Sequence, residues 1–497
     1  MRRLLAIGAM ATLALASPAA AAKPWQPKPP LEQHGRWLTD KRGRVALLHG
    51  VNMVYKVPPY HAAAAGFGRN DALFLRRHGF NTVRLGVIYK GVEPEPGQFD
   101  RGYLRKLRRT ERILARQRIF TQIDFHQDLY NERFQGEGFP DWAVIDDGLP
   151  AIPEAGFPGN YFLMPALIRA FDHFWANDAG PGGKGLQDFY ARAWRKVAQR
   201  FAKRRWVMGY DVFNEPWPGS PWLTCANPVG CPAFDTGPLL AMSSKVEAAI
   251  RKADRDGIVW FEPQVLFNNG ADSSLPRIGS GPQGFSFHDY CLPSSTLAPY
   301  FPQDPLAGLE CDNFDGIVFE NADKQAEEAG QALLLSEFGA TNDAFALDRI
   351  PDLADDHMVS WQYWHYCDCN DPTTTGVGVQ SIVPDAHKAP RGDNLNKPKL
   401  DLLERPYPQL VAGTPRSFSY DDTTGVFELQ YDKRSVRRGK FKRGRTRVFL
   451  PRSDFKRGYA VKVRGARVLS KPGAKTLKLR NRGRRPDVSL TVTPEPA

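Results

Sequence analysis

Between residues 44 and 366, eight short β-rich runs alternate with helical patterns. The runs cover residues 44–53, 82–89, 118–127, 207–216, 257–264, 284–290, 331–339 and 359–366. The clearest helical pattern is in residues 185–203, where large apolar residues recur at roughly helical spacing with Arg and Lys between them. Strands that alternate with helices form a parallel sheet, and eight of them close into a barrel. We therefore expect an α/β fold, a (β/α)8 or TIM barrel.

Two of these runs end in a carboxylate. Asn214 and Glu215 close the fourth run, where Pro216 stops the strand, and Glu337 follows Leu333-Leu334-Leu335-Ser336 in the seventh. A single Glu at a strand end is more often a surface residue or part of a salt bridge. Two carboxylates at the carboxyl ends of barrel strands, however, can form the pair that hydrolyses a glycosidic bond.

The other strand ends carry polar and aromatic side chains. They include Asn52, Arg84, His126 with Asp128, Glu262, His288 with Tyr290, and Trp364. In a barrel these side chains converge on one basin, and a purely structural chain has little reason to place them there. Residues 128–183 and 217–238 form two long connections rich in Phe, Trp and Pro. They are expected either to wall a cleft or to pack around the barrel rim.

The composition changes near residue 405. From residue 418 onward, short alternating strands separated by Gly and Pro turns predict a small antiparallel β-sandwich. Its expected strands cover residues 426–431, 445–451, 459–468, 475–479 and 488–493. Residues 405–497 contain 24 Lys and Arg against 7 Asp and Glu, a charge of +17, and the remaining residues sum to −4. Such a basic domain suits contact with an anionic membrane surface, although a solvated basic face explains it equally well. No nucleic-acid recognition motif accompanies it, so we expect no nucleic-acid partner.

The N-terminus has the pattern of an export signal. Met1-Arg2-Arg3 precedes an apolar run from residue 4 to 16 and an Ala-rich cleavage site before Lys23. We expect domains at 1–22 (signal peptide), 23–404 (barrel) and 405–497 (basic sandwich), and a secreted protein; a retained anchor is the alternative.

Of the six cysteines, Cys225 with Cys231 and Cys291 with Cys311 bracket short loops and favour local disulfides, which leaves Cys367 and Cys369. No metal-ligand spacing accompanies them.

These motifs resemble glycoside hydrolase family 5. The resemblance rests on Asn214-Glu215-Pro216 and Ser336-Glu337-Phe338-Gly339, and Arg84, His126, His288, Tyr290 and Trp364 fall on the strands that carry the family's supporting residues. A narrower likeness is to the endoglycoceramidases. It is carried by Gly50-Val51-Asn52 with Lys56, Asp124-Phe125-His126-Gln127-Asp128, the segments 214–219 and 261–267, and Arg405-Pro406-Tyr407-Pro408. The tail is far more basic than that family requires.

The resemblance implies a retaining β-glycosidase, with Glu215 as acid/base and Glu337 as nucleophile, that cleaves glycan from ceramide without cofactor or metal. Asn214 is expected to bind the sugar 2-hydroxyl, and Tyr290 and Arg84 to hold Glu337. The expected substrate-binding residues are Lys56, Arg84, His126, Asp128, Asn214, His288, Tyr290 and Trp364. The partner is then a glycolipid or glycan, and the protein a monomer. A soluble β-glycan or β-glucoside hydrolase and a noncatalytic carbohydrate-binding protein are the alternatives.

Overall fold

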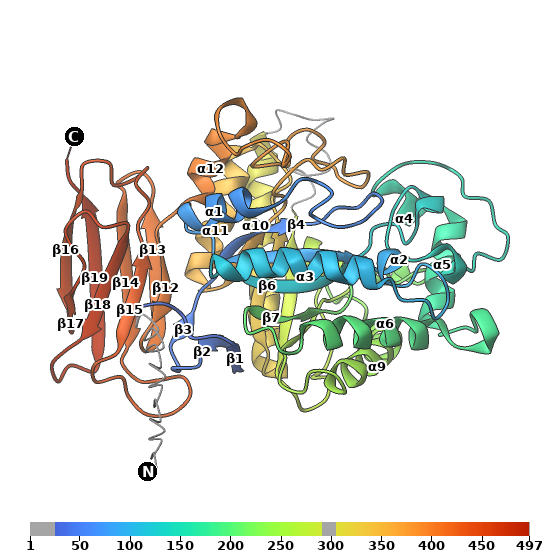
Figure 1. Ribbon diagram of the computed structural model, residues 1–497, viewed down its shortest axis with the longest axis horizontal. Helices are drawn as coiled ribbons and strands as arrows, with labels where there is room; N and C mark the ends of the chain where they lie inside the picture. The colour runs from blue at the N-terminus through green and yellow to red at the C-terminus, as the bar shows by residue number, and fades with distance from the viewer. Residues whose placement is uncertain (1–24, 291–304, 497) are drawn as a thin grey trace, which may run out of the picture.

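The computed structural model of the protein describes residues 25–290 and 305–496. Its centre is a closed barrel of parallel strands in the order β10-β11-β4-β5-β6-β7-β8-β9 (Figure 1). The strands are β4 (His49–Met53), β5 (Thr82–Ile88), β6 (Phe120–His126), β7 (Val207–Asp211), β8 (Val259–Phe261), β9 (Gln283–Asp289), β10 (Ala332–Phe338) and β11 (Ser360–Tyr363). Each strand falls on one of the eight predicted runs, so the predicted barrel is confirmed.

Helices connect and cover the strands. The longer ones are α1 (Arg69–Arg77), α3 (Arg101–Arg116), α5 (Pro165–Trp175), α6 (Leu186–Phe201), α9 (Leu240–Arg251), α10 (Pro305–Ala329), α11 (Ala344–Asp356) and α12 (Lys397–Leu403). The short ones are α2 (Tyr89–Val92), α4 (Gly159–Leu163), α7 (Trp222–Cys225) and α8 (Pro232–Phe234). In α6 the apolar face predicted from the sequence is buried against the barrel, where the indole nitrogen of Trp194 donates to the Val212 carbonyl at 2.9 Å.

The C-terminal strands form two antiparallel sheets, as predicted. The four-stranded sheet has the order β13-β14-β19-β16, and the seven-stranded sheet has the order β1-β2-β3-β12-β15-β18-β17. The strands are β1 (Leu31–His34), β2 (Trp37–Asp40), β3 (Val45–Ala46), β12 (Tyr407–Val411), β13 (Thr414–Asp421), β14 (Val426–Asp432), β15 (Arg445–Phe449), β16 (Tyr459–Arg464), β17 (Ala466–Val468), β18 (Thr476–Asn481) and β19 (Asp487–Pro494).

Two predicted strands are divided in the structure. The run 44–53 splits because Ala46 pairs with Leu410 of β12, in the sandwich, while the barrel strand begins only at His49. The run 459–468 splits at Gly465, whose positive φ of 76° turns the chain from β16 in one sheet to β17 in the other. The sandwich therefore includes strands that precede the barrel, which the predicted boundary at residue 405 does not capture.

The sandwich and the β1–β2 hairpin lie at the amino ends of the barrel strands. One buried apolar cluster combines residues of β1, β2 and β12 with residues at the starts of barrel strands: Leu31, Leu38 and Leu410 with Phe120, Met208 and Ala332. The Tyr407 hydroxyl also donates to the Gly79 carbonyl, three residues before β5. Figure 1 accordingly shows the sandwich on one side of the barrel and the α4–α5 connection on the other.

Of the two predicted local disulfides, the Cys225–Cys231 bond is confirmed. Cys225 is bonded to Cys231, and Cys367 to Cys369. The predicted pairing of Cys291 with Cys311 involves Cys291, which lies outside the described residues, as does the predicted signal peptide. None of the described helices has the length and apolar character needed to cross a membrane.

A buried ion pair joins the sandwich to the barrel and yields a stability prediction. Arg405 is 3% exposed and contacts Asp355 of α11 at 3.2 Å. Burial raises the pKa of Asp355 to about 8 against the lowering effect of Arg405, which also pairs with Asp352 of the same helix. We expect Arg405→Met to lower the free energy of unfolding in urea by about 3 kcal/mol. Arg416→Met, which breaks an exposed pair with Asp432, should cost less than about 1 kcal/mol. Equal losses of unfolding free energy in Arg405→Met and Arg416→Met would contradict this account.

Candidate active site

Glu215 and Glu337 are aimed into one cleft by irregular backbone at two strand ends. Glu215 follows β7 with a left-handed φ of 46°, an uncommon conformation for a residue with a side chain. Its backbone N–H donates to Oε2 of Glu262 at 2.8 Å, which holds this conformation. The register of β10 against β9 shifts between Leu335 and Glu337, and such a bulge redirects a side chain.

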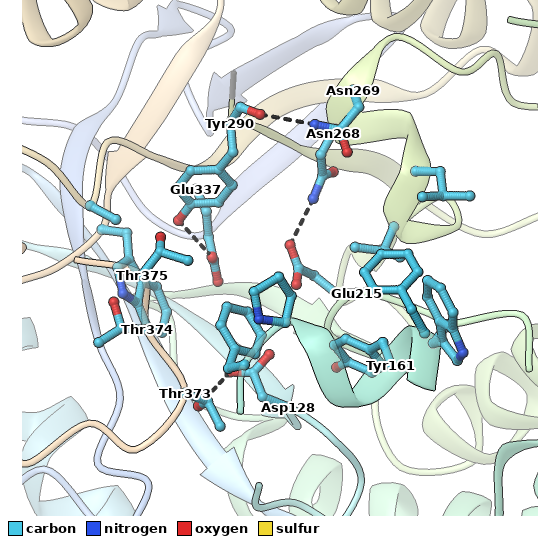
Figure 2. A pocket seen from close by; sticks show the side chains of 18 of the residues that line it. Asp128, Tyr161, Glu215, Asn268, Asn269, Tyr290, Glu337, Thr373, Thr374 and Thr375 are labelled. Atoms are coloured by element: carbon cyan, nitrogen blue, oxygen red, sulfur yellow. Dashed lines mark hydrogen bonds between the residues drawn. The ribbon is translucent and has the colours of Figure 1, made fainter. Parts of the chain in front are cut away.

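The two carboxylates lie close together. One carboxylate oxygen of Glu215, one of Glu337 and a ring nitrogen of His288 all lie within 4.8 Å of one another. Figure 2 shows the two side chains side by side in the pocket. A separation of this size suits a carboxylate that attacks the sugar directly, because an inverting pair must leave room for a water molecule and is about 6.5–9.5 Å apart.

Arg84 of β5 lies beneath the pair and has no exposed surface. Its guanidinium contacts Glu337, Asp211 at 3.0 Å, Asp124 at 3.0 Å and Glu262 at 2.7 Å. Carboxylates of the protein thus surround the guanidinium. The structure therefore supports the predicted role of Arg84 in holding Glu337. Arg84 was also predicted to bind substrate, but its side chain has no surface exposed to the cleft.

Glu337 is held in its charged form by donors on two sides. Arg84 contacts Oε1, and the Tyr290 hydroxyl donates to Oε2 at 3.0 Å. Burial raises the pKa of Glu337 to about 6, against the lowering effect of His288 and Arg84. The carboxylate is therefore mostly ionised at neutral pH and becomes protonated as the pH falls through about 6.

Glu215 has different partners. The Asn268 amide donates to its Oε1 at 2.7 Å, and Nδ1 of His288 lies 2.9 Å from the same oxygen. Burial alone would lower the pKa of His288, but Glu262 and Glu337 outweigh it and raise the pKa well above its usual value. His288, 1% exposed, therefore lies as a cation between the two carboxylates and contacts them rather than the open cleft.

Asn214, beside the acid, is 1% exposed and bonded on both sides. Its Oδ1 accepts from Arg84 at 2.9 Å, and its Nδ2 donates to the Gln127 carbonyl at 3.0 Å. These bonds fix the orientation of the amide. Its predicted contact with a sugar hydroxyl stays a prediction.

A polar cluster forms one side of the cleft. Nζ of Lys56 lies 2.7 Å from Asp128 and 3.0 Å from Asp371, and 4.5 Å from the ring centre of Trp364. The His126 ring stacks on Trp364 at 5.2 Å. Burial would lower the pKa of His126, but Asp124 and Asp128 raise it to about 10. The structure thus brings the predicted residues Lys56, His126, Asp128 and Trp364 together.

The opposite side of the cleft is apolar. Its walls include side chains from the two long connections and from the turn after β8: Phe157, Pro158, Tyr161, Phe162, Trp217, Val265 and Leu266. The cleft has an empty volume of about 950 Å³, counting the part that opens to solvent. One site therefore offers hydrogen-bonding groups on one side of the carboxylate pair and an apolar surface on the other.

Comparisons with known proteins agree with this geometry. A model of the cellulase domain of glycosyl hydrolase family 5 matches residues 69–370, and a model of the glycoside hydrolase family 5 C-terminal domain matches residues 405–493. The chain belongs to glycoside hydrolase family 5. It is thus a glycoside hydrolase, and the resemblance found in its motifs is confirmed.

Individual proteins are similar to this chain over most of its length. Endoglycoceramidase I of Rhodococcus hoagii (strain 103S) is 35% identical over 462 residues, covering 91% of this chain and 86% of that protein. An endoglycoceramidase of Hydra vulgaris is 26% identical over 86% of this chain and 81% of its own. The solved structure of endo-glycoceramidase II from Rhodococcus sp. with a five-membered iminocyclitol has a TM-score of 0.75 at 29% identity, covering 93% of this chain and 100% of that one.

Several residues of this family 5 site were not predicted from the sequence. Asn268 bonds Glu215 from a 3-10 turn, η5 (Val265–Asn269), that begins within the segment 261–267 and ends two residues beyond it. Thr373, Thr374 and Thr375 line the cleft from the irregular stretch after β11. Glu262 was noted only as a strand-end residue. Asn268 could have been predicted as a site residue because it is a polar residue just beyond a strand-end motif. No sequence pattern indicates that the three threonines line the cleft.

Three clusters of potential metal ligands lie in or beside the cleft: Glu215, His288 and Glu337; His126, Asp128 and Glu137; and Asp124, Asp211 and Glu262. Protein cations already compensate them, because Arg84 pairs with Asp124, Asp211, Glu262 and Glu337, and Lys56 with Asp128. A fourth group contains Cys367 and Cys369, which are joined in a disulfide. The prediction that no metal or cofactor is needed stays a prediction.

The environment of Glu337 predicts the acid limb of the pH profile. Because Glu337 must be ionised to attack, kcat/KM on an aryl β-glycoside should fall as the pH drops below about 6. Tyr290→Phe removes a donor that favours the carboxylate, so the limb should move upward by roughly half a unit to one unit. Tyr459→Phe, which removes a hydroxyl bonded in the sandwich, should leave it in place. A limb that stays or moves downward in Tyr290→Phe would contradict the assignment.

Proposed function

We propose that the protein hydrolyses the β-glycosidic bond between the glycan and the ceramide of glycosphingolipids, with retention at the anomeric carbon. The observation that carries the proposal is the carboxylate pair, Glu215 and Glu337, placed where a polar and an apolar side of one cleft meet. A glycosphingolipid has the same division, with sugars on one side of the scissile bond and a lipid on the other.

The relatives support this choice of substrate. The relatives that are similar over most of the chain include endoglycoceramidases of Rhodococcus hoagii and Cyanea nozakii, and one solved structure of endo-glycoceramidase II from Rhodococcus sp. is a complex with ganglioside GM3. That structure has a TM-score of 0.73 and 28% identity, covering 93% of this chain and 99% of that one. We therefore assign the polar side of the cleft to the glycan and the apolar side to the ceramide.

The first step forms a glycosyl-enzyme. The Glu337 carboxylate attacks the anomeric carbon while Glu215 gives its proton to the glycosidic oxygen, so that ceramide leaves as an alcohol. Arg84 and Tyr290 keep Glu337 charged and oriented before the attack. Asn268 and His288 fix the position of the Glu215 carboxyl.

The second step reverses the roles. The Glu215 carboxylate takes a proton from water, the resulting hydroxide adds to the anomeric carbon, and Glu337 leaves as a carboxylate. Two inversions give net retention. In both steps Trp364 and the Lys56–Asp128 pair, which lie together in the cleft, hold the adjoining sugar, the indole through its apolar face and the charged pair through bonds to sugar hydroxyl groups.

Three further expectations remain predictions. They are secretion after cleavage near residue 22, a monomeric state, and contact of the basic residues 405–497 with anionic membranes. The position of the sandwich bears on the expected membrane contact, because the sandwich lies at the end of the barrel away from the cleft. A basic face there does not bring a membrane-bound substrate toward Glu215 and Glu337.

Substitution of the two carboxylates tests the mechanism. Glu337→Gln should lower kcat on an aryl β-glycoside by about 10³-fold or more, because no nucleophile remains. Glu215→Ala should be slow on glycolipid but regain rate with azide on substrates with good leaving groups. An NMR time course of the wild type should show the retained anomer first. Inversion, or azide rescue that gives the same anomer from both variants, would refute the roles.

A product analysis tests the substrate. Mass spectrometry of intact gangliosides, lactosylceramide and glucosylceramide incubated with the protein in detergent should show free ceramide and intact glycan. Soluble β-glucan and β-mannan are the controls, because a cellulase- or mannanase-type enzyme would share the catalytic residues. Hydrolysis of the polysaccharides without release of ceramide would replace the proposal by that alternative, and no hydrolysis even of aryl glycosides would favour a noncatalytic protein.

A further inference from the structure

Exposed apolar side chains gather at the cleft end of the barrel. Among the described residues, the large hydrophobic side chains with high exposure are Ile152, Leu163, Leu223, Val229, Phe314, Ile317, Phe345, Val377 and Leu469. All except Leu469 lie on connections that leave the carboxyl ends of barrel strands. Leu469 lies in the sandwich. Since exposed apolar groups that cluster on one face indicate a binding surface, the cleft end is the place to look for a partner.

Three of these residues form a patch at the edge of the cleft. Leu163, at the end of α4, is 56% exposed, and Leu223 of α7 is 69% exposed. Their chain neighbours Phe162 and Trp222 pack edge to face at 5.0 Å, which brings α4 and α7 together. Val229, 67% exposed, follows on the same loop as Leu223. We call Leu163, Leu223 and Val229 the rim patch.

The rim patch continues into the apolar wall of the cleft. Phe162 lines the cleft beside Trp217, with their rings 5.0 Å apart. Trp217 also lies 5.8 Å from Trp222, so a row of aromatic rings leads from the rim patch to the pocket that holds Glu215.

The loop that carries Val229 has its polar groups bonded internally. The Asn227 side chain donates to the carbonyls of Thr224 at 2.8 Å and Gly230 at 3.2 Å, and accepts from the Val229 N–H at 2.9 Å. The Cys225–Cys231 disulfide closes the same loop. Because bonded polar groups cost less to remove from water, this loop is suited to entering an apolar phase.

The charge distribution matches an apolar partner. Residues 155–168 and 216–234, which contain α4, α7 and α8, include no Asp, Glu, Lys or Arg. Charged groups would oppose insertion, and these segments carry none. The charge of +17 in residues 405–497 lies with the sandwich, at the other end of the barrel.

We propose that the rim patch inserts into the surface of a bilayer or micelle, so that the mouth of the cleft faces the lipid. The inference rests on the proposed function, because a ceramide-linked substrate resides in such a surface. The row of rings at Phe162, Trp217 and Trp222 then receives the ceramide as it leaves the lipid. Binding is apolar and needs neither anionic lipid nor the basic sandwich.

Vesicle binding tests the proposal without substrate. The full chain should sediment with phosphatidylcholine vesicles that contain no glycolipid, and the partition should persist at high salt, since no ion pair is involved. The double variant Leu163→Asp with Leu223→Asp should lower the partition coefficient by about tenfold or more. Leu469→Asp is the matched control, because it adds the same charge to an exposed leucine of the sandwich, and should bind as the wild type does.

A second variant separates this proposal from the basic domain. Arg437→Glu with Lys440→Glu reverses charge on the sandwich and should leave binding to phosphatidylcholine unchanged. The proposal is overturned if the wild type does not bind phosphatidylcholine vesicles, or if the rim variant binds them as well as the wild type does. It is equally overturned if the wild type binds only anionic vesicles and the sandwich variant loses that binding. It is also overturned if the wild type is a dimer that the rim variant dissociates, which would assign the patch to a second copy.

Activity in solution keeps the two proposals apart. The rim variant should hydrolyse a soluble aryl glycoside as the wild type does and lose rate only on glycolipid in vesicles. Lost aryl-glycoside activity in the rim variant would show a damaged cleft and overturn the assignment of this patch to docking. If the wild type binds vesicles through the patch but releases no ceramide, the proposed function fails while the docking surface stands.

Discussion

The site depends on one buried cation, the guanidinium of Arg84, among carboxylates from several barrel strands. A buried charge is tolerated only when it is paired and hydrogen-bonded. Arg84 of β5 satisfies this by contacting Asp124 of β6, Asp211 of β7, Glu262 after β8 and Glu337 of β10. Burial and the neighbouring carboxylates raise the pKa of Asp211 well above its usual value, against the lowering effect of Arg84.

The two catalytic carboxylates differ in their surroundings, and this difference suits their two roles. Glu337 is bonded by Arg84 and Tyr290, both donors that favour a charged oxygen. Glu215 is bonded by a neutral amide, Asn268, and by His288, while its own backbone is held by Glu262. The nucleophile is thus bonded to Arg84 and Tyr290, and the acid/base to Asn268 and His288.

Much of this arrangement follows from local sequence because a parallel barrel brings all strand ends to one edge. A carboxylate after a buried run, as at Glu215 and Glu337, is therefore predictable. Asn268 and Thr373 were missed because irregular loops, which have no periodicity, carry them into the cleft. The division of residues 44–53 was missed for another reason: Ala46 pairs with Leu410, a partner that no local pattern can indicate.

The central claim is that Glu337 forms a covalent bond to the sugar. Incubation of the protein with an activated 2-deoxy-2-fluoro β-glycoside, which slows release of the intermediate, followed by peptide mass spectrometry, tests it directly. The account predicts a single glycosyl label on the peptide that contains Glu337, and none in Glu337→Gln. A label on Glu262 or Glu215, or inactivation without any covalent adduct, would contradict it.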